Sequence, residues 1–454
     1  MGRHTERPTR SWNLAPAAVI LGLLAAGPVG AQAPVLPHVD TSLTMEQAVD
    51  LALQKSLRVR VAQADSRVMD SMRREALGPF WPQLSANGYA NDQNLAPNVY
   101  SSAGTTMARN TQVFLADQTG TANVTAMYSL FAGGRDYYGY KAAAARADAA
   151  RQMLRGAEVD VAMQARLDYI ASLREAENVR VTGDLVRQVE ERLRVTREAF
   201  DAGRVPRFYV LRDEAELANT VQMDAMARSR ADQALVALKT TLGIDLGSTI
   251  ALADRLAHTP VAVSVDEAIR TATERHPEVQ AALKQRQGAE ADVRAAYGNY
   301  FPQVGVAAMY DWTRMKTGGG STEPDQGYSV GVVVTLPIFD GFMRENAVRT
   351  TKAKLDRATQ ADGLVRQQVA KEVSQAALML GAAEKSVEAS QKGLEQAEEE
   401  FRIVQERFAA GRGIQLEILD AQASRTRARF NAVAALAEYQ TALAMWRRAI
   451  GEIR

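Results

Sequence analysis

A repeat of apolar residues near the C-terminal end most constrains what this chain can fold into. Twelve positions follow one another at alternating steps of four and three residues, and eleven of them are apolar. They are Val369, Val373, Ala376, Leu380, Ala383, Val387, Ser390, Leu394, Ala397, Phe401, Val404 and Phe408. A repeat averaging about 3.5 residues keeps one apolar seam facing a partner helix over many turns, which is typical of a left-handed coiled coil. We therefore expect a very long helix that packs along another helix.

The bounds of this helix follow from proline and glycine. Proline, which breaks helix interiors, is absent from Asp340 to the C-terminus. We expect a helix over residues 343–408 that ends at Gly411-Arg412-Gly413, because glycine permits the backbone conformations of a tight reversal. A second apolar-periodic segment, residues 414–450, would then run back alongside the first.

The composition indicates a folded protein without a charge surplus. Of 454 residues, 46% are hydrophobic and 24% are charged, and the formal net charge is +1. A nearly balanced chain gives no reason to expect nucleic acid as a partner. The chain contains no cysteine, which excludes disulfides and thiolate metal sites and suits an oxidising periplasm.

The N-terminal segment, residues 1–31, is typical of a secretory signal peptide. Three arginines precede an apolar run over residues 14–26, and the small residues at 29–31 suit cleavage. A transmembrane anchor is the alternative, but the apolar run is too short to span a bilayer comfortably. We expect export with cleavage. Removing three arginines and one glutamate leaves 51 basic and 52 acidic residues, so the mature chain is close to neutral.

The rest of the chain contains an internal repeat. The motif Phe80-Trp81-Pro82-Gln83 matches Tyr300-Phe301-Pro302-Gln303 at an offset of 220 residues. Further along, Phe200-Asp201-Ala202-Gly203-Arg204 matches Phe408-Ala409-Ala410-Gly411-Arg412 at an offset of 208 residues. The change of offset predicts a longer loop in the first half, between the first motif and Leu130.

Each half predicts the same order of elements: a pair of short helices, a β-hairpin and a long helical hairpin. Thr44 and Ser264 are suited to cap the opening helices, which should break near Leu57 and at His276-Pro277. We assign residues 32–243 to a first repeat, residues 244–263 to a linker, and residues 264–454 to a second repeat. Within the repeats we place β-hairpins at about 83–131 and 303–338, and long helical hairpins at about 134–243 and 342–450.

The strands of these hairpins alternate with period two. The clearest apolar positions are Val304, Val306, Ala308, Tyr310, Trp312, Tyr328, Val330, Val332, Val334 and Leu336. A half-apolar hairpin more commonly packs on a soluble core, but every other segment here belongs to a long helix with its own seam. Lipid is the better cover, since the strands reach the roughly 9 to 11 residues of a transmembrane strand. Four strands cannot close a barrel, so the chain has to oligomerise.

Together these features resemble the outer-membrane efflux protein (TolC) family over essentially the whole mature chain. The resemblance rests on the duplicated opening helix, the aromatic-proline motifs Trp81-Pro82 and Phe301-Pro302, and the segment Phe408-Ala409-Ala410-Gly411-Arg412 with the following Leu416-Glu417-Ile418-Leu419-Asp420-Ala421-Gln422. It implies a mainly α fold with a small antiparallel β part. Long coiled-coil helical hairpins would form an α-barrel tunnel, and four strands per chain would contribute to a trimeric transmembrane β-barrel.

The resemblance also implies a function. The protein would be the outer-membrane channel, or passive exit duct, of a tripartite efflux or type I secretion system, with most of the chain in the periplasm. Its partners would be two further copies in a homotrimer, outer-membrane lipid, a periplasmic adaptor (membrane-fusion) protein and an inner-membrane pump of RND or ABC type. A periplasmic coiled-coil adaptor or scaffold protein is the alternative function. A heat-modifiable oligomer in outer-membrane fractions would fit only the channel.

Two groups of residues are candidates for a functional site. The resemblance implies that an adaptor docks at the tips of the helical hairpins, at Gly203, Arg204, Gly411, Arg412 and Gly413, although helix capping and dipole complementation explain these residues equally well.

The second group is acidic. Glu417 and Asp420 stand three residues apart on one helix face and match by position the acidic pair at the family's narrow periplasmic entrance. In a trimer, six such carboxylates around the constriction of a periplasmic gate would attract cations. A solvated helix face is the simpler alternative.

The sequence does not indicate an enzyme. Its four histidines are not spaced as a metal pair, and no glycine-rich phosphate loop or nucleophile elbow is present. The mixed-charge run 187–197 favours a solvated coiled-coil face over a nucleic-acid patch. We therefore expect no enzymatic activity, no catalytic residues, no cofactor and no metal.

Overall fold

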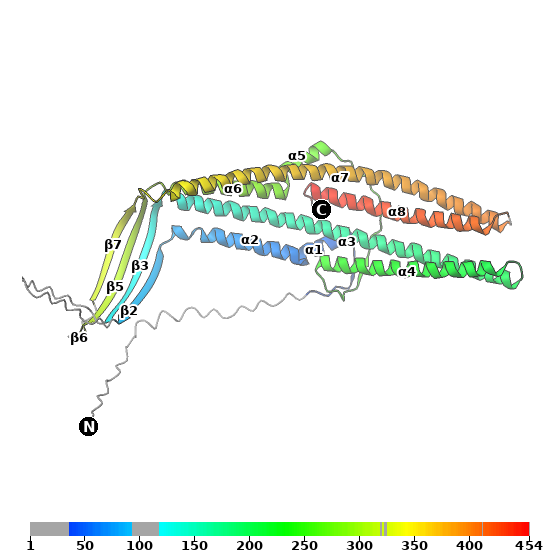
Figure 1. Ribbon diagram of the computed structural model, residues 1–454, viewed down its shortest axis with the longest axis horizontal. Coiled ribbons are helices and arrows are strands. Elements are labelled where there is room, and N and C mark those ends of the chain that lie inside the picture. The colour runs from blue at the N-terminus through cyan, green and yellow to red at the C-terminus, as the bar shows by residue number, and fades with distance from the viewer. Residues whose placement is uncertain (1–35, 93–117, 318–319, 322–324, 411, 454) are drawn as a thin grey trace, which may run out of the picture. The chain divides into compact units, whose positions relative to one another are not determined.

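The computed structural model describes residues 36–92, 118–317, 320–321, 325–410 and 412–453 (Figure 1). The expected signal peptide, 1–31, and Gly411 lie outside these residues. The fold is mainly helical with a small antiparallel sheet, which confirms the fold class predicted from the sequence. Within the described ranges, no helix is long and apolar enough to cross a membrane.

The described residues form two compact units. One unit contains Leu77–Tyr137 and Ala295–Arg344, and it holds the main sheet. The other contains Leu36–Ala76, Tyr138–Arg294 and the chain from Glu345 onward, and it holds most of the helical residues. Each sequence repeat contributes to both units, so the repeats are not separate compact bodies.

The main sheet consists of four long strands and one very short strand. The long strands are β2 (Gln83–Asp92), β3 (Gln118–Ala132), β5 (Gln303–Thr317) and β7 (Asp325–Thr335), and β6 (Gly320–Ser321) pairs with the end of β5. Their order is β2-β3-β5-β7, and all neighbours are antiparallel. The pairing of β3 with β5 joins the two repeats. β2 and β7 are the edges of the sheet.

One face of this sheet is apolar and exposed, as the period-two alternation predicts. Reading across the strands in register, this face holds Leu84, Ala86, Val124, Ala126, Tyr128, Val304, Val306, Ala308, Tyr310, Tyr328, Val330, Val332 and Val334. Tyr328 is 81% exposed and Val330 is 69% exposed. The opposite face is more polar, and there Asn87 Nδ2 donates a hydrogen bond to Asn123 Oδ1 at 3.1 Å.

The short helices of the first repeat are α1 (Met45–Lys55) and α2 (Leu57–Glu75), and those of the second are α5 (Val265–Arg275) and α6 (Pro277–Gly298). A capping box begins α1: the Thr44 hydroxyl accepts from the Gln47 N–H, and the Gln47 side chain accepts from the Thr44 N–H. The breaks fall where the sequence predicts them. A three-residue 3-10 turn, Gly78–Phe80, leads from α2 towards β2.

Two antiparallel hairpins hold most of the helical residues (Figure 1). The first consists of α3 (Arg135–Asp201) and α4 (Arg207–Leu242), and the second of α7 (Met343–Ala409) and α8 (Gln415–Ala449). Both α3 and α7 are 67 residues long. Their bounds differ by the 208-residue offset seen in the sequence.

The two repeats build their cores from equivalent positions. Each core packs the short helices onto the long hairpin of its own repeat. The equivalent buried pairs are Ala52 and Ala272, Val59 and Val279, Val161 and Val369, and Leu238 and Trp446. The heptad-like seam of α7 is buried at Val369, Val373 and Val387, while its last member, Phe408, is 44% exposed. The coiled-coil prediction is therefore confirmed along most of the seam.

The segment expected to be a linker also contains a strand. Residues 250–252 form β4 (Ile250–Leu252), which pairs in parallel with β1 (Thr41–Leu43). The Asp40 carboxylate accepts the Thr249 N–H at 2.8 Å and extends this pairing by one bond. Strands of three residues are too short to produce a recognisable alternation, so the sequence did not reveal them.

Candidate functional site

The turn of the first hairpin is a glycine-terminated helix end. Gly203 has a φ of +69°, which an L side chain rarely adopts. Its N–H donates to Phe200 O at 2.8 Å, and the Arg204 N–H donates to Ala199 O at 2.8 Å. These two bonds form a Schellman motif that satisfies the last carbonyls of α3. Capping thus explains the predicted tip residue Gly203, while the side chain of Arg204 is exposed to solvent.

The turn of the second hairpin repeats this pattern. The Arg412 N–H donates to Arg407 O at 2.9 Å, which is the equivalent of the Arg204 bond at an offset of 208 residues. Gly411 lies outside the described residues. Gly413 is constrained by packing: a Cβ atom there would lie 3.2 Å from Phe408 N and 3.3 Å from Phe408 Cα. The second turn therefore leaves little room for a side chain at position 413.

The two predicted gate carboxylates lie in different environments. Glu417 is half-buried in the first turn of α8, and its Oε2 atom is enclosed without a hydrogen-bond partner among the described residues. Its charge suits the positive end of the helix dipole. Asp420 is exposed to solvent. The spacing of three residues is present as expected, but only Asp420 has a freely solvated carboxylate.

A polar network near these turns was not predicted from the sequence. Asp213 of α4 is fully buried, and its carboxylate accepts from Arg192 Nε at 3.0 Å and from Thr196 Oγ1 at 2.7 Å. Arg192 also donates from Nη1 to Gln422 Oε1 of α8 at 2.5 Å. A buried carboxylate needs such partners because its transfer from water is costly. The network therefore joins the first hairpin to the returning helix of the second.

A second set of contacts continues this connection along α8. The Arg425 guanidinium lies 3.9 Å from the centre of the Phe401 ring, and it also donates to Gln188 of α3. The pKa of Arg425 lies below its ordinary value, mainly because the guanidinium is partly buried. Arg429 forms an ion pair with Glu398 at 3.3 Å. Side chains of α8 thus contact both α3 and α7.

These contacts correct one expectation from the sequence. The charged run 187–197 was expected to be a solvated face, and the side chains of Arg187 and Arg194 are 73% and 56% exposed. The side chain of Arg192, however, is only 15% exposed. The sequence did contain a signal for the burial of Arg192. It stands seven residues after Leu185, a buried residue of α3, so both lie on the same side of the helix.

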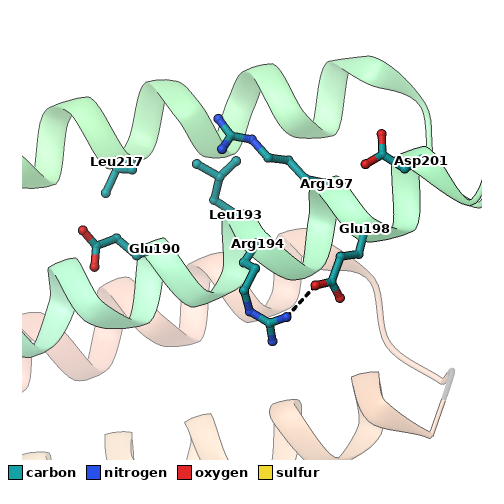
Figure 2. A pocket seen from close by; sticks show the side chains of 7 residues that line it. All are labelled: Glu190, Leu193, Arg194, Arg197, Glu198, Asp201 and Leu217. Atoms are coloured by element: carbon teal, nitrogen blue, oxygen red, sulfur yellow. Dashed lines mark hydrogen bonds and ion pairs between the residues drawn. The ribbon is translucent and has the colours of Figure 1, made fainter.

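A shallow charged groove lies beside the first turn. Its volume is about 330 Å³, and its lining residues are Glu190, Leu193, Arg194, Arg197, Glu198, Asp201 and Leu217. Figure 2 shows Arg194 and Glu198 paired on α3. The same arrangement recurs in the second repeat, where Arg402 pairs with Glu399 and Glu406. Ion pairs of this kind are common on solvated helix faces and identify no small-molecule ligand.

The apolar face of the sheet is the second candidate surface. Tyr310 and Trp312 of this face pack edge to face at 4.5 Å, and Trp81 and Phe301 precede β2 and β5 in the chain. The neighbouring rows hold mainly alanine and valine, together with Leu84 and Tyr128. Apolar bands with aromatic ends are typical of strands that face a bilayer.

Comparisons with known proteins agree with this arrangement. Residues 268–452 match the family model described as outer membrane efflux protein. The chain is thus similar to the outer membrane efflux protein family, whose model covers most of its second repeat. The resemblance drawn from the sequence is therefore confirmed, and the family consists of outer-membrane transport proteins.

Named relatives of this family cover much of the chain. The outer membrane efflux protein BepC of Brucella suis is 27% identical over 67% of this chain and 66% of its own length. Protein CyaE of Bordetella pertussis is 26% identical over 90% of this chain and 84% of its own length. The CmeC outer membrane channel of Campylobacter jejuni has a TM-score of 0.76 at 16% identity, over 90% of this chain and 85% of CmeC. This last likeness establishes the fold.

Proposed function

We propose that the chain is the outer-membrane exit duct of a tripartite efflux or type I secretion system. It would conduct substrates passively, and it would have no enzymatic activity of its own. The observation that carries the proposal is the sheet of four long strands, which has one exposed apolar face and two edges that no other described strand pairs with. Unpaired strand edges are not tolerated in lipid, so only a closed ring of several chains fits this sheet.

A homotrimer is the assembly that we propose. Three sheets of four long strands would give a barrel of twelve, whereas two would give only eight and a narrow interior. The edges are suited to this closure, because β2 and β7 have 10 and 11 residues and opposite directions. The similarity to outer membrane efflux proteins supports the same proposal.

The hairpin turns are the proposed docking site for a periplasmic adaptor. An inner-membrane pump of RND or ABC type would supply energy through that adaptor. Support comes from the exposed Arg204 and Arg412, which occupy equivalent positions in two turns of the same hydrogen-bonding pattern. Replacing Gly411 with a bulky residue should abolish export while trimers remain in the outer membrane. Unchanged export by that variant would refute adaptor docking at the turn.

Glu417 and Asp420 are the proposed gate carboxylates. In a trimer they would supply six acidic groups to the entrance, and Asp420 would contribute the larger effect because it is exposed.

Membrane fractionation tests the main proposal. We expect a heat-modifiable oligomer in outer-membrane fractions, with a mass near three chains after cross-linking. The chain released in soluble form, or a stable monomer in the membrane, would exclude the exit duct. Release in soluble form would favour the periplasmic adaptor or scaffold instead.

A further inference from the structure

A groove between three helices lies near the middle of α3 and α7, away from the hairpin turns. Residues of α3, α7 and α8 line it, and its volume is about 720 Å³. Small-molecule sites are concave and mostly apolar, with volumes of about 300–1,000 Å³. The walls of this groove include Ile170 of α3, Met379 and Ala382 of α7, and Ala437 and Met445 of α8. The groove therefore has the size and the lining of a small-molecule site.

The two methionines give the groove an adaptable surface. Met379 is 53% exposed although it is apolar, and the adjacent Leu378 is 75% exposed. Methionine side chains are unbranched and polarisable, so they rearrange to fit apolar groups of different shapes. The groove thus suits a class of apolar ligands better than one particular shape.

Three polar side chains of the groove have no side-chain hydrogen bond or ion pair with a described residue. They are the hydroxyls of Ser386 and Thr441 and the carboxylate of Glu438. Elsewhere on the same helices such hydroxyls donate to the carbonyl four residues earlier, as Ser374 does to Ala370 O at 2.9 Å. A few convergent polar groups in an apolar site fix the orientation of a ligand. This groove offers two hydroxyls and one carboxylate.

The charge of the groove is negative. Its ionisable lining residues are two carboxylates, Asp168 and Glu438, and one guanidinium, Arg174, which gives a net charge of −1. Arg174 is already paired with Glu175 at 2.8 Å. The Asp168 carboxylate accepts hydrogen bonds from neutral side chains, so it keeps its charge uncompensated. A surface of this charge attracts cations and repels anions.

The equivalent positions of the first repeat are different. The offset of 208 residues relates Glu438 to Arg230 and Met445 to Ala237. The hairpin packing that the two repeats share therefore requires neither the acid nor the methionine. This difference favours a role in binding for these side chains of α8.

We propose that this groove binds an organic cation with an apolar body. The apolar body lies against Met379, Ala382 and Met445, and the positive charge faces Glu438. The purpose of the site rests on the exit duct proposed above: the groove would hold a substrate on the wall of the tunnel.

The groove lies on the side of α8 that suits this purpose. Tyr439 Oη donates to Thr259 O at 2.6 Å, so the segment around Thr259 covers one side of α8. Ala437 and Thr441 stand two residues before and after Tyr439, which places them on the opposite side of the helix. In the proposed ring the segment around Thr259 lies outside, because it would otherwise fill the bore. The groove then opens into the bore.

Dye binding tests the proposal. The probe is rhodamine 6G, a cationic aromatic dye, titrated with the purified full-length protein in detergent and followed by fluorescence polarisation against protein-free micelles. We expect saturable binding to the natural chain. Glu438→Gln keeps the shape of the side chain and removes its charge, so it should weaken binding about fivefold. Ala382→Trp fills the groove from an exposed position of α7 and should weaken binding at least tenfold.

Each variant has a matched control on α7. Glu388→Gln removes a carboxylate that lies on the opposite side of α7 from Ser386. Ala389→Trp places the same indole seven residues beyond Ala382, outside the lining of the groove. Both controls should bind rhodamine 6G like the natural chain. Fluorescein, an anionic dye with a related ring system, should bind at least tenfold more weakly than rhodamine 6G.

The possible outcomes separate this inference from the proposed function. Absence of saturable binding, or equal binding of the two dyes, would overturn the proposal. Binding that neither Glu438→Gln nor Ala382→Trp weakens would place the dye elsewhere and overturn it as well, and if one variant does not fold, the other decides. None of these results affects the exit duct, which membrane fractionation tests separately. The expected binding pattern in a chain released in soluble form would support the groove and refute the exit duct.

Discussion

The two helical hairpins have the same turn but different interiors beside it. In the first hairpin the buried position after the turn is Asp213, bound by Arg192 and Thr196. At the equivalent position of the second hairpin, 208 residues later, is Ala421, which is also buried. The first hairpin therefore buries a charged network beside its turn, whereas the second buries the methyl group of an alanine there.

This difference shows where the duplicated chain has become specialised. The cores near the short helices keep equivalent apolar residues, such as Val161 and Val369. The turns keep equivalent hydrogen bonds. Between them, the contact of the first hairpin with α8 has become polar and depends on partners from three helices. A buried polar contact is sensitive to the loss of any one partner, because the remaining charge or hydrogen-bonding group is left unpaired.

The largest effect should come from removing the buried carboxylate. Asp213→Ala leaves the Arg192 guanidinium, which is 15% exposed, without its carboxylate, and we expect a loss of about 3–5 kcal/mol. Adding Arg192→Leu should recover most of this loss, because it removes the buried guanidinium that Asp213→Ala leaves without its carboxylate. Thermal unfolding of the detergent-solubilised protein, followed by circular dichroism, measures both.

The neighbouring Glu214 provides the matched control for this prediction. It pairs with Arg197 at 2.7 Å on the surface, and both side chains are more than 40% exposed. Glu214→Ala should therefore cost no more than about 1 kcal/mol. If Asp213→Ala were as mild as Glu214→Ala, the network would not hold the hairpin.

The next effect compares the two turns. The equivalent of Gly413 in the first turn is Val205. Gly413→Val would place its side chain against Phe408 and should cost about 1–3 kcal/mol, with faster proteolysis at the second turn. Val205→Gly should have the smaller effect, below about 1 kcal/mol. Equal effects of the two variants would mean that the turns do not differ in packing.

A smaller effect on stability, with a distinct effect on transport, is expected for the gate carboxylates. Their equivalents in the first repeat are Tyr209 and Arg212, so only the second hairpin carries acids here. Glu417→Gln should cost about 0.3–1 kcal/mol by losing its interaction with the helix dipole. Asp420→Asn should change stability by less than about 0.5 kcal/mol. In planar bilayers both variants should reduce the preference for cations, and an unchanged reversal potential would exclude the gate role.

The smallest effect concerns acid stability of the first repeat. The hydrogen bond from Arg151 holds the pKa of Asp70 below its ordinary value of 3.8. A carboxylate with a lowered folded pKa contributes stability that is present above the ordinary value and is lost as the pH falls through the folded pKa. Below that pH range, Asp70→Asn should therefore unfold at the same temperature as the natural chain. Above it, the variant should unfold at a slightly lower temperature. Identical acid melting curves for the two proteins at every pH would show that the ion pair is without effect.

The sequence predicted more of the fold than of the site. Heptad spacing, turn glycines and strand alternation are local, so residues a few positions apart were enough to indicate α7, the hairpin turns and the apolar face of the sheet. The three-residue strands β1 and β4 were missed because their pairing joins segments about 200 residues apart. The network around Asp213 was missed for the same reason, since its partner Gln422 is distant in the chain.

The sequence by itself determined the duplication, the long helical hairpins and the residues at their turns, because each of these depends on periodicity within one element. Only the tertiary structure decided which charges are buried and which faces stay open. Arg192 and Arg194 look alike in the sequence, yet one lies in a network between helices and the other in solvent. Likewise, Val68 and Gly288 are equivalent in the repeat, yet only Gly288 is covered within the chain. Burial depends on what the rest of the chain places opposite a residue, and one segment of sequence does not contain that information.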